Sequence, residues 1–334
     1  MPDRLDALKH WLNTELAFRD YTIKPASADA SFRRYFRITH EGACYIVMDA
    51  PPEKEDSRAF IDIANMFLDV GLNVPEIIDE NLDQGFLLLS DLGTRLYLDE
   101  LNQGTVGRLY DDALGALATI QGCVPGEGVL RDYDRALLMS EMALFRDWLV
   151  GRHLGLELTG EQHAMLDAAF DLLADNALEQ PQVCVHRDYH SRNLMVSRSN
   201  NPGILDFQDA VLGPVTYDLV SLLRDCYIRW PRERVEDWAL GYLDLALQSG
   251  VLRAEHEDPQ RFLRWFDLMG VQRHLKAAGI FARLCHRDGK PAYLGDIPRT
   301  LGYVTEVAGR YEQLAGLEDF VRSRVLDALH KVAG

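Results

Sequence analysis

The chain of 334 residues is 47% hydrophobic and 26% charged, which is ordinary for a soluble protein and leaves room for two lobes with separate cores. Its formal net charge of −17 argues against nucleic acid or an anionic membrane as a partner, because both bind a clustered positive surface. The five cysteines are widely spaced and form no Cys-x-x-Cys pair, which indicates free thiols in a reducing cytosol. Since no signal peptide and no apolar run of membrane-spanning length is present, we expect a cytoplasmic protein.

The first part of the chain predicts a helix followed by a small sheet. An apolar stripe at helical spacing follows Asp3, a suitable N-cap, and consists of Leu5, Leu8, Leu12 and Leu16. Strand-like runs then cover residues 21–25, 31–38 and 45–48, with a turn of small residues at 26–30. These patterns predict a packing helix beside antiparallel strands.

A second helix and a further strand complete this region. The helix is predicted by a buried stripe before Gly71 and Pro75, namely Phe60, Ile63, Ala64, Phe67 and Leu68. An apolar strand from Gly85 ends in a polar corner near residue 92, where we place a domain boundary. Beyond it, apolar periodicity predicts helices at 106–120, 138–154 and 159–178, the last with a capping box at Thr159.

The most informative stretch is residues 183–218. Two apolar runs, LMVS and PGILDF, flank the turn residues 198–203 and predict a β-hairpin. That hairpin would bring Asn193 and Asp206 side by side, with Asp188 on the preceding loop within reach. Oxygen ligands of this kind suit Mg²⁺ against a nucleotide, and Asp188 would orient an attacking hydroxyl and take its proton. The alternative is that Asp and Asn gather here only for turn geometry.

These residues resemble a known family. His186-Arg187-Asp188 with Asn193, followed by Asp206-Phe207, is similar to the catalytic loop and metal-binding Asp of the aminoglycoside phosphotransferase and choline kinase family. His190 is typical of this branch. The short interval from Asp206 to Asp218 leaves no room for a peptide-docking segment, so a small-molecule acceptor is implied.

The resemblance implies an α+β, two-lobe, protein-kinase-like fold with ATP between the lobes. Residues 1–92 would form a nucleotide-binding lobe with a small antiparallel sheet and one main helix, and 93–334 a mainly helical catalytic and substrate-binding lobe. Its further implications are that Asn193 and Asp206 hold Mg²⁺, that Asp188 is catalytic, and that Asp218 braces the catalytic loop as well as capping a helix. The implied nucleotide contacts are Ser31, Phe32, Arg33 and Arg34 over the phosphates, and Ser90, Asp91 and Leu92 at the adenine.

One departure from the family pattern concerns the lysine of the third strand. Its position falls near Met48, and neither that strand nor the inner face of the next helix supplies the usual Lys and Glu. We hypothesise that Lys54 or an arginine from residues 33–37 provides the positive charge. A nucleotide-binding regulatory pseudokinase is the alternative, although the intact Asp188, Asn193 and Asp206 argue against it.

Three longer motifs bear on the acceptor, namely SFRRYFRI, HRDYHSRNLM and GILDFQDAVLGPVTYDLVSLLRD. Together they resemble a branch of bacterial amino-sugar kinases that phosphorylate N-acetylmuramate and N-acetylglucosamine at the anomeric hydroxyl during peptidoglycan recycling. An aminoglycoside, choline or another small alcohol remains the alternative, and no obligate protein partner is evident. Aromatic and cationic groups suit a sugar and a carboxylate. The candidate substrate residues are Arg187, His190, Arg224, Tyr227, Arg273 and His274.

Overall fold

A computed structural model of the chain describes residues 4–28, 32–126 and 128–333. The chain forms two units, one comprising Met1–Arg95 with Met195–Gln208, and the other Leu96–Leu194 with Asp209–Gly334. The first crossing between the units lies close to the expected boundary near residue 92. The segment 195–208, which the sequence boundaries place in the second lobe, instead folds with the first unit.

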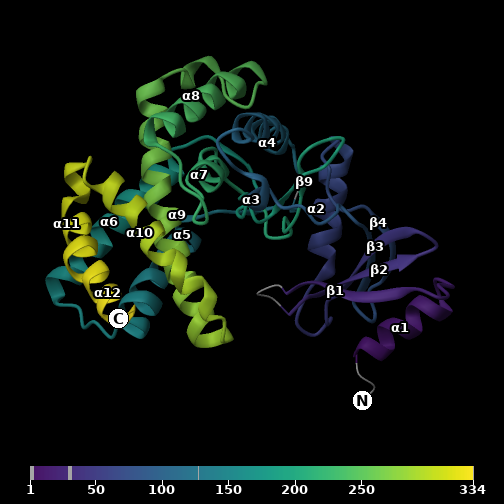
Figure 1. Ribbon diagram of the computed structural model, residues 1–334. Coiled ribbons are helices and arrows are strands. Elements are labelled where there is room, and N and C mark those ends of the chain that lie inside the picture. Colours follow the sequence, from purple (N-terminus) through teal and green to yellow (C-terminus); the bar gives the residue numbers. More distant parts are fainter. Residues whose placement is uncertain (1–3, 29–31, 127, 334) are drawn as a thin grey trace. The chain divides into compact units, whose positions relative to one another are not determined.

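The first unit contains a five-stranded antiparallel sheet with the strand order β1-β2-β3-β5-β4 (Figure 1). The strands are β1 (Thr22–Ala28), β2 (Arg34–His40), β3 (Ala43–Asp49), β4 (Ile77–Asn81) and β5 (Phe86–Ser90). The three predicted amino-terminal strands are confirmed, although β2 begins at Arg34 and not at residue 31. The sequence analysis missed β4, whose side chains are largely exposed and give no apolar alternation.

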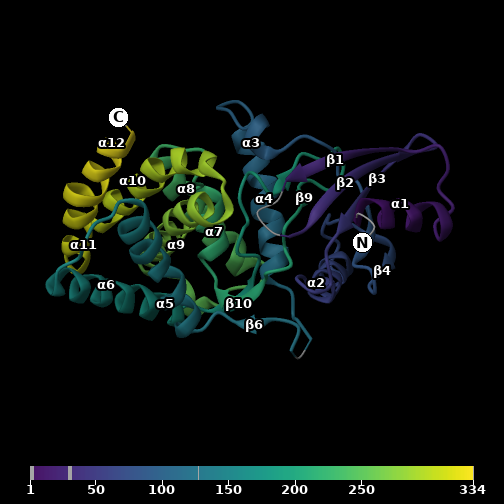
Figure 2. The same ribbon diagram turned by 90° about the horizontal axis from the view of Figure 1, so that it is seen from below.

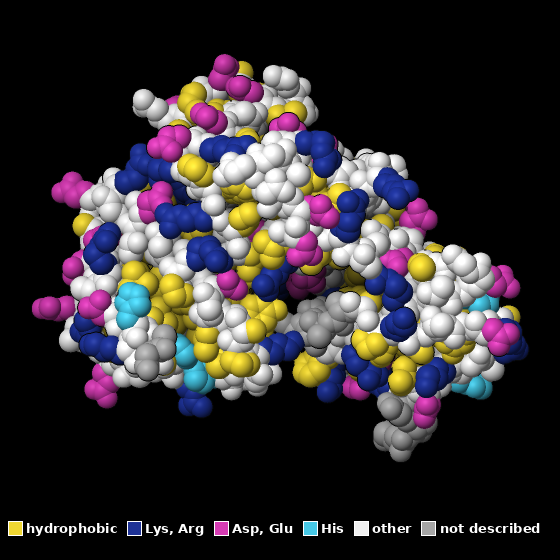
Figure 3. All heavy atoms as spheres, viewed as in Figure 1, with side chains coloured by type: hydrophobic (Ala, Val, Ile, Leu, Met, Phe, Trp, Pro, Cys, Tyr) yellow, Lys and Arg dark blue, Asp and Glu magenta, His cyan; other side chains and the backbone are white. Residues whose placement is uncertain are grey.

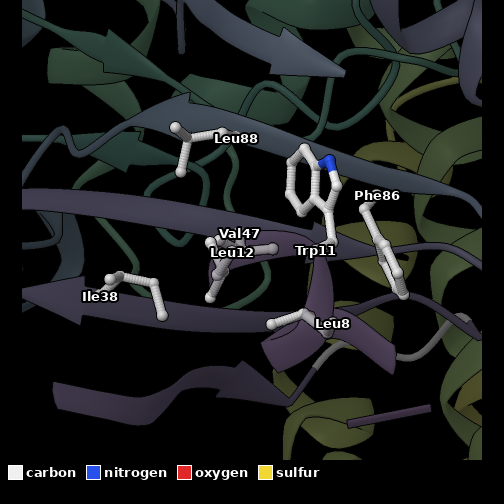
Figure 4. Packing of buried hydrophobic residues seen from close by; sticks show 7 residues of the cluster. All are labelled: Leu8, Trp11, Leu12, Ile38, Val47, Phe86 and Leu88. Carbon is white, nitrogen blue, oxygen red and sulfur yellow. The ribbon is translucent and has the colours of Figure 1, made fainter. Parts of the chain in front are cut away.

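Helix α1 (Arg4–Thr14) packs on this sheet, as the leucine spacing predicts. Its buried side chains Leu8, Trp11 and Leu12 form one cluster with sheet residues (Figure 4). The Trp11 and Phe86 rings are stacked with their centroids 5.7 Å apart. Burial of each large apolar side chain stabilises the fold by about 1.5–3 kcal/mol, so α1 is an integral part of this unit. The expected N-cap, Asp3, lies outside the described residues.

Helix α2 (Ser57–Asp69) also matches its predicted stripe. Phe60 and Phe67 are buried, and Gly71, just beyond the helix end, adopts the left-handed conformation (φ 81°) that favours glycine at this position. Met48 in β3 is fully buried, in the place where the family pattern expects a lysine. The residue in the place of that lysine, Met48, is therefore an apolar side chain of the core.

The second unit has a three-stranded sheet and many helices. Its strands β6 (Arg131–Asp132), β10 (Val211–Pro214) and β7 (Gln182–Val185) lie in that order. A separate two-stranded sheet pairs β8 (Leu194–Met195), at which the chain passes between the units, with β9 (Gly203–Ile204) of the first unit. The predicted hairpin is thus confirmed, with strands shorter than the two apolar runs.

Three helices confirm the predicted helical segments. They are α4 (Val106–Gln121), α5 (Arg135–Leu144) continued by the π-helical η1 (Phe145–His153), and α6 (Gly160–Leu178). The capping box of α6 is present, since the Gln162 N–H donates to Thr159 Oγ1 (3.2 Å) and the Thr159 N–H donates to Gln162 Oε1 (3.0 Å).

The helix expected to begin at Asp218 is α7 (Tyr217–Leu223), and the other remaining helical segments were not delimited from sequence. They are α3 (Tyr97–Glu100), α8 (Arg232–Gln248), η2 (Ala254–His256), α9 (Pro259–Asp288), η3 (Pro291–Asp296), α10 (Ile297–Ala308), η4 (Glu312–Leu314), α11 (Ala315–Phe320), η5 (Val321–Leu326) and α12 (Asp327–Ala333). Helix α9 is the longest, with 30 residues, and packs against α5, α6, α7, α8 and α10 (Figure 2). It is therefore the central helix of this unit.

The surface shows no concentration of positive charge on the face drawn in Figure 3, where acidic and basic side chains are interspersed. None of the helices within the described ranges has the length and apolar character needed to cross a membrane.

The contact between α9 and the end of α5 predicts the effect of adding one methyl group. A Cβ on Gly279 would lie 2.3 Å from the backbone carbon of Leu144, so Gly279→Ala must push two helices apart. We expect the free energy of unfolding to fall by about 2 kcal/mol or more, measured by urea denaturation. The matched change Gly241→Ala on α8 meets no atom within 4 Å and should stabilise the helix by up to about 1 kcal/mol. Equal effects of the two changes would contradict this packing.

Candidate active site

The loop between β7 and β8 carries the predicted catalytic residues. Within it, the carbonyl of Asp188 accepts the His190 N–H (3.0 Å) and the side-chain amide of Asn193 (2.9 Å). The His190 carbonyl in turn accepts the Asn193 N–H (2.9 Å). The Asp188 N–H donates to Nδ1 of the buried His186 (3.3 Å), which confirms that His186 holds the loop backbone. Asp188 and Asn193 are therefore parts of one closed, hydrogen-bonded loop.

The Asp218 carboxylate holds the backbone of this loop by hydrogen bonds. It is fully buried and accepts the backbone N–H groups of His186 (2.6 Å) and Arg187 (3.0 Å). Arg187 has φ 76°, a left-handed conformation that is costly for a residue with a side chain, and the two hydrogen bonds hold it there. The bracing role implied by the family resemblance is confirmed. The helix-capping role is wrong, because Asp218 lies inside the first turn of α7 and Thr216 occupies the N-cap position.

The charge on Asp188 is controlled by cations behind the loop. Burial alone raises the pKa of this carboxyl, but Lys276, His190, Arg187 and Arg273 together outweigh that effect and lower the pKa to about 2. Asp188 is therefore ionised throughout the physiological range. Burial acts in the same sense on Asp218, but there it outweighs the two backbone N–H donors and raises the pKa to about 7.

A buried acid, Glu141 on α5, holds both cations in place. Its carboxylate forms ion pairs with Arg187 and with Lys276, the latter at 3.2 Å, and also accepts the Tyr133 hydroxyl. The Lys276 ammonium group additionally donates to the Tyr217 hydroxyl (2.8 Å). Although burial opposes ionisation, Lys276 and Arg187 lower the pKa of Glu141. Arg187 thus balances charge beside Asp188, and its expected role as a substrate residue stays a prediction.

Two other candidate substrate residues come together beside the loop. The His190 and Tyr227 rings meet edge to face with centroids 5.3 Å apart. Burial lowers the pKa of His190, so this imidazole is neutral at physiological pH. The guanidinium of Arg192, from the same loop, lies 3.8 Å from the centre of the Tyr227 ring. An aromatic and cationic surface therefore adjoins the catalytic loop.

Three candidate substrate residues lie instead in the interior of the second unit. Arg224 is ion-paired with Asp267 (2.5 Å), and His274 Nε2 is 2.8 Å from the Arg224 carbonyl oxygen. Burial lowers the pKa of His274 to about 3, so it is neutral. Arg273 is also buried and donates to Cys226 Sγ (3.5 Å). These groups are engaged with other parts of the protein, and a substrate role for Arg224, Arg273 and His274 stays a prediction.

In the first unit, the candidate phosphate-covering residues differ in their partners. Ser31 lies outside the described residues. Arg34 pairs with the buried Asp49 (2.5 Å), whose other oxygen binds Arg4. Arg33 pairs with Glu55 (3.1 Å), while Lys54 lies over the exposed Phe32 ring (4.3 Å).

The expected adenine corner follows β5. The Glu76 N–H donates to Ser90 Oγ (2.9 Å), and Asp91 pairs with Arg37 (2.6 Å), so both side chains serve to shape the corner. Arg37 also donates to the Gly93 carbonyl (2.7 Å). Leu92 packs near Gly203 of β9. If this corner contacts adenine, its backbone groups would make the contact.

Asp206 follows β9 in the first unit and has φ 64°. Its neighbour Phe207 is fully buried against Phe60 and Phe67 of α2, at centroid distances of 4.9 and 5.7 Å. Gln208 Nε2 donates to Asp206 Oδ1 (2.9 Å). Asp206 is therefore anchored to the first unit, whereas Asn193 belongs to the second, and the expectation that they lie side by side stays a prediction.

Comparison with known proteins identifies the family to which this arrangement of loop, brace and hairpin belongs. Residues 22–262 match the model of the phosphotransferase enzyme family, APH. The chain belongs to this family. Such membership implies ATP as the phosphate donor.

The phosphotransferase has close relatives that carry the name N-acetylmuramate/N-acetylglucosamine kinase. The protein of Pseudomonas putida is 48% identical, with 95% of this chain and 96% of that protein covered. The Pseudomonas aeruginosa protein is 51% identical, with 90% and 87% covered. The Neisseria meningitidis protein is 45% identical, with 93% and 92% covered.

Solved structures confirm the predicted fold of the phosphotransferase. Choline kinase LicA from Streptococcus pneumoniae superposes with a TM-score of 0.62 at 12% identity, covering 90% of this chain and 99% of that one. The ADP-bound aminoglycoside phosphotransferase APH(2'')-Ib gives a TM-score of 0.59 at 16% identity, covering 90% and 98%. At these identities the likeness concerns the α+β kinase-like fold alone.

Sequence analysis of the phosphotransferase missed Glu141, Lys276 and Arg192. Glu141 lies in a helix that reads as scaffold, and only the fold brings it to Arg187 and Lys276. Arg192 adjoins Asn193 within the motif, so its position between the catalytic and metal-binding candidates was an available signal.

The ion pairs of Glu141 predict a specific loss of stability. Glu141→Gln would leave the buried cations Arg187 and Lys276 without their anion, and we expect the free energy of unfolding to fall by about 3–5 kcal/mol at pH 7.5. The additional change Lys276→Met should restore part of this loss, because it removes one of the uncompensated charges. Urea denaturation measures all variants, with Glu312→Gln on the exposed surface as the control.

The loss of stability caused by Glu141→Gln must become smaller as the pH falls. Because the pKa of Glu141 is lowered in the folded state, its stabilising contribution is present above the unfolded pKa of about 4.3 and is lost as the pH falls. The difference between wild type and Glu141→Gln should therefore shrink when the measurement is repeated near pH 4. A loss at pH 7.5 no larger than that of Glu312→Gln would contradict the ion-pair cluster.

Proposed function

We propose that this phosphotransferase transfers the γ-phosphate of ATP to the anomeric C1 hydroxyl of N-acetylmuramate and N-acetylglucosamine. The observation that carries the proposal is the Asp188 loop, in which hydrogen bonds hold the backbone around an ionised aspartate, in a chain 45–51% identical to relatives named for these two sugars. The reaction would serve peptidoglycan recycling, and a cytoplasmic location stays a prediction.

Asp188 would act on the sugar hydroxyl mainly by accepting its hydrogen bond. A carboxylate with a pKa of about 2 is a weak base, so it contributes little driving force for early proton removal. Phosphoryl transfer through a loose transition state needs little such help, because the nucleophile gains little charge before the new bond forms. An anomeric hydroxyl is also more acidic than other sugar hydroxyls. Orientation of the attacking oxygen is thus the main contribution that we assign to Asp188.

Asn193 and Asp206 would hold Mg²⁺ against the ATP phosphates. The Asn193 amide nitrogen points to the Asp188 carbonyl, so its oxygen is the atom suited to a cation. The carboxylate of Asp206 is held by Gln208. One carboxylate and one amide oxygen fit a hard cation that takes its remaining ligands from phosphate and water. Bound Mg²⁺ would neutralise charge on the transferring phosphoryl group.

For the nucleotide, we propose that Arg33 and Glu55 replace the lysine and glutamate of the family pattern. Their ion pair at 3.1 Å joins the segment before β2 to the segment before α2, and both side chains are mostly buried. Arg34 and Arg37 are less suitable, since each is already paired with an aspartate. Phe32 and Arg34 would then flank the phosphates, and the backbone of Ser90, Asp91 and Leu92 would contact adenine.

A substrate panel tests the reaction and its acceptor together. ADP release from Mg-ATP should occur with N-acetylmuramate and N-acetylglucosamine, and not with their methyl glycosides, in which C1 carries no hydroxyl. Kanamycin and choline should be inactive. Turnover with either of these instead of the amino sugars would overturn the acceptor assignment while leaving phosphoryl transfer intact.

The role of Asp188 is tested in the same assay. Asp188→Asn should lower kcat by about 10³-fold or more, because the amide cannot accept the proton and presents a donor group to the hydroxyl. The dissociation constant for ATP, measured by calorimetry, should stay within about threefold of the wild type. Asp244→Asn, an exposed change on α8, is the matched control. Near-normal turnover of Asp188→Asn would remove this residue from the mechanism.

A further inference from the structure

Arg192 is an unusual cation on the catalytic loop. Its guanidinium carbon lies 3.8 Å from the centre of the Tyr227 ring and 5.6 Å from that of Tyr293. These contacts are with aromatic faces, and across the described ranges Arg192 forms no hydrogen bond or ion pair with another residue. Since stacking uses the face of a guanidinium, its N–H edges stay available for an oxygen ligand.

The buried carboxylate of Asp225 fixes the position of this cation. One of its oxygens accepts the Ser191 N–H (2.9 Å) and the other accepts the Tyr227 N–H (2.9 Å). Asp225 therefore ties the residue before Arg192 to the residue on which Arg192 stacks. Because the carboxylate is directed at backbone groups, it orders the stack without neutralising Arg192 by a direct pair. Such preorganisation reduces the entropy lost when a ligand binds.

The stack lies close to the catalytic carboxylate. His190 contacts the Tyr227 ring, and the charges of both Asp188 and Arg192 act on its imidazole. His190 thus separates the two charged groups within a single loop. Phe281 and Tyr293, stacked at 5.7 Å, extend the aromatic surface beside Tyr227. A sugar ring whose C1 hydroxyl reaches Asp188 would have its other substituents near this surface, which is suited to carbohydrate.

We propose that Arg192 binds the lactyl carboxylate of N-acetylmuramate and so favours this sugar over N-acetylglucosamine. The inference rests on the proposed function. The two sugars differ in the lactyl group, and its carboxylate is the only formal charge that distinguishes them. A guanidinium with exposed edges binds a carboxylate through two parallel hydrogen bonds, whereas a neutral hydroxyl offers it a much weaker partner.

The decisive experiment compares kcat/KM for N-acetylmuramate, its neutral amide and N-acetylglucosamine in wild type and Arg192→Gln. We expect Arg192→Gln to lower kcat/KM for N-acetylmuramate by about 10- to 100-fold, mainly through KM, and for the other two sugars by less than about threefold. Arg192→Lys, which keeps the charge but not the planar fork, should give an intermediate loss. Arg324→Gln on the exposed surface is the matched control.

Other outcomes separate this inference from the proposed function. Wild-type protein that phosphorylates neither amino sugar would overturn the proposed function itself. Suppose that wild type accepts both sugars but Arg192→Gln lowers kcat/KM equally for the two, or raises KM for ATP with both. Arg192 then has a structural or nucleotide-binding role and the inference fails. The inference would likewise be overturned if the ratio of kcat/KM for N-acetylmuramate to kcat/KM for its amide were the same in Arg192→Gln as in wild type. Activity on N-acetylglucosamine reports whether the variant is folded.

Discussion

The bond pattern on which the catalytic loop depends is the acceptance of two successive backbone N–H groups by Asp218. These bonds stabilise Arg187 in a left-handed conformation that its side chain disfavours, directly before Asp188 in the loop. Burying a carboxylate is costly, as the raised pKa of Asp218 indicates. The loop geometry therefore lowers the stability of the core of the second unit. The hydrogen bond from Asn193 to Asp188 then closes the loop.

Electrostatic control of the site comes from a group of residues distant in sequence. Lys276 on α9 and Arg187 on the loop keep Asp188 ionised, and Glu141 on α5 keeps these cations from repelling one another. The arrangement matters in a chain with a net charge of −17, because an isolated carboxylate facing ATP would repel it. In the proposed reaction, this local compensation would allow an acidic protein to present the ionised Asp188 to a substrate beside a nucleotide.

Sequence patterns predicted the features that local rules determine. The α1 stripe, the β8–β9 turn and the α6 capping box are set by residues close together in the chain, and the structure confirms them. Helix α9 is different, because it is buried on most of its surface and carries polar residues inside the unit. A sequence pattern cannot distinguish an interior His274 from one that faces a ligand, so the burial of this residue could not be predicted.

The low pKa of Asp188 links the electrostatics to the choice of acceptor. A strong base would favour any alcohol that fits, but a carboxylate held at about 2 assists by position more than by proton affinity. With such a weak base, the reaction rate would be lowered least for acceptors that ionise easily, such as an anomeric hydroxyl. In the proposed reaction, selectivity would then come from how the rest of the acceptor is held, and the aromatic surface around Tyr227 with the Arg192 cation adjoins the loop that carries Asp188. Charge around the base and contacts around the sugar are thus complementary parts of one specificity.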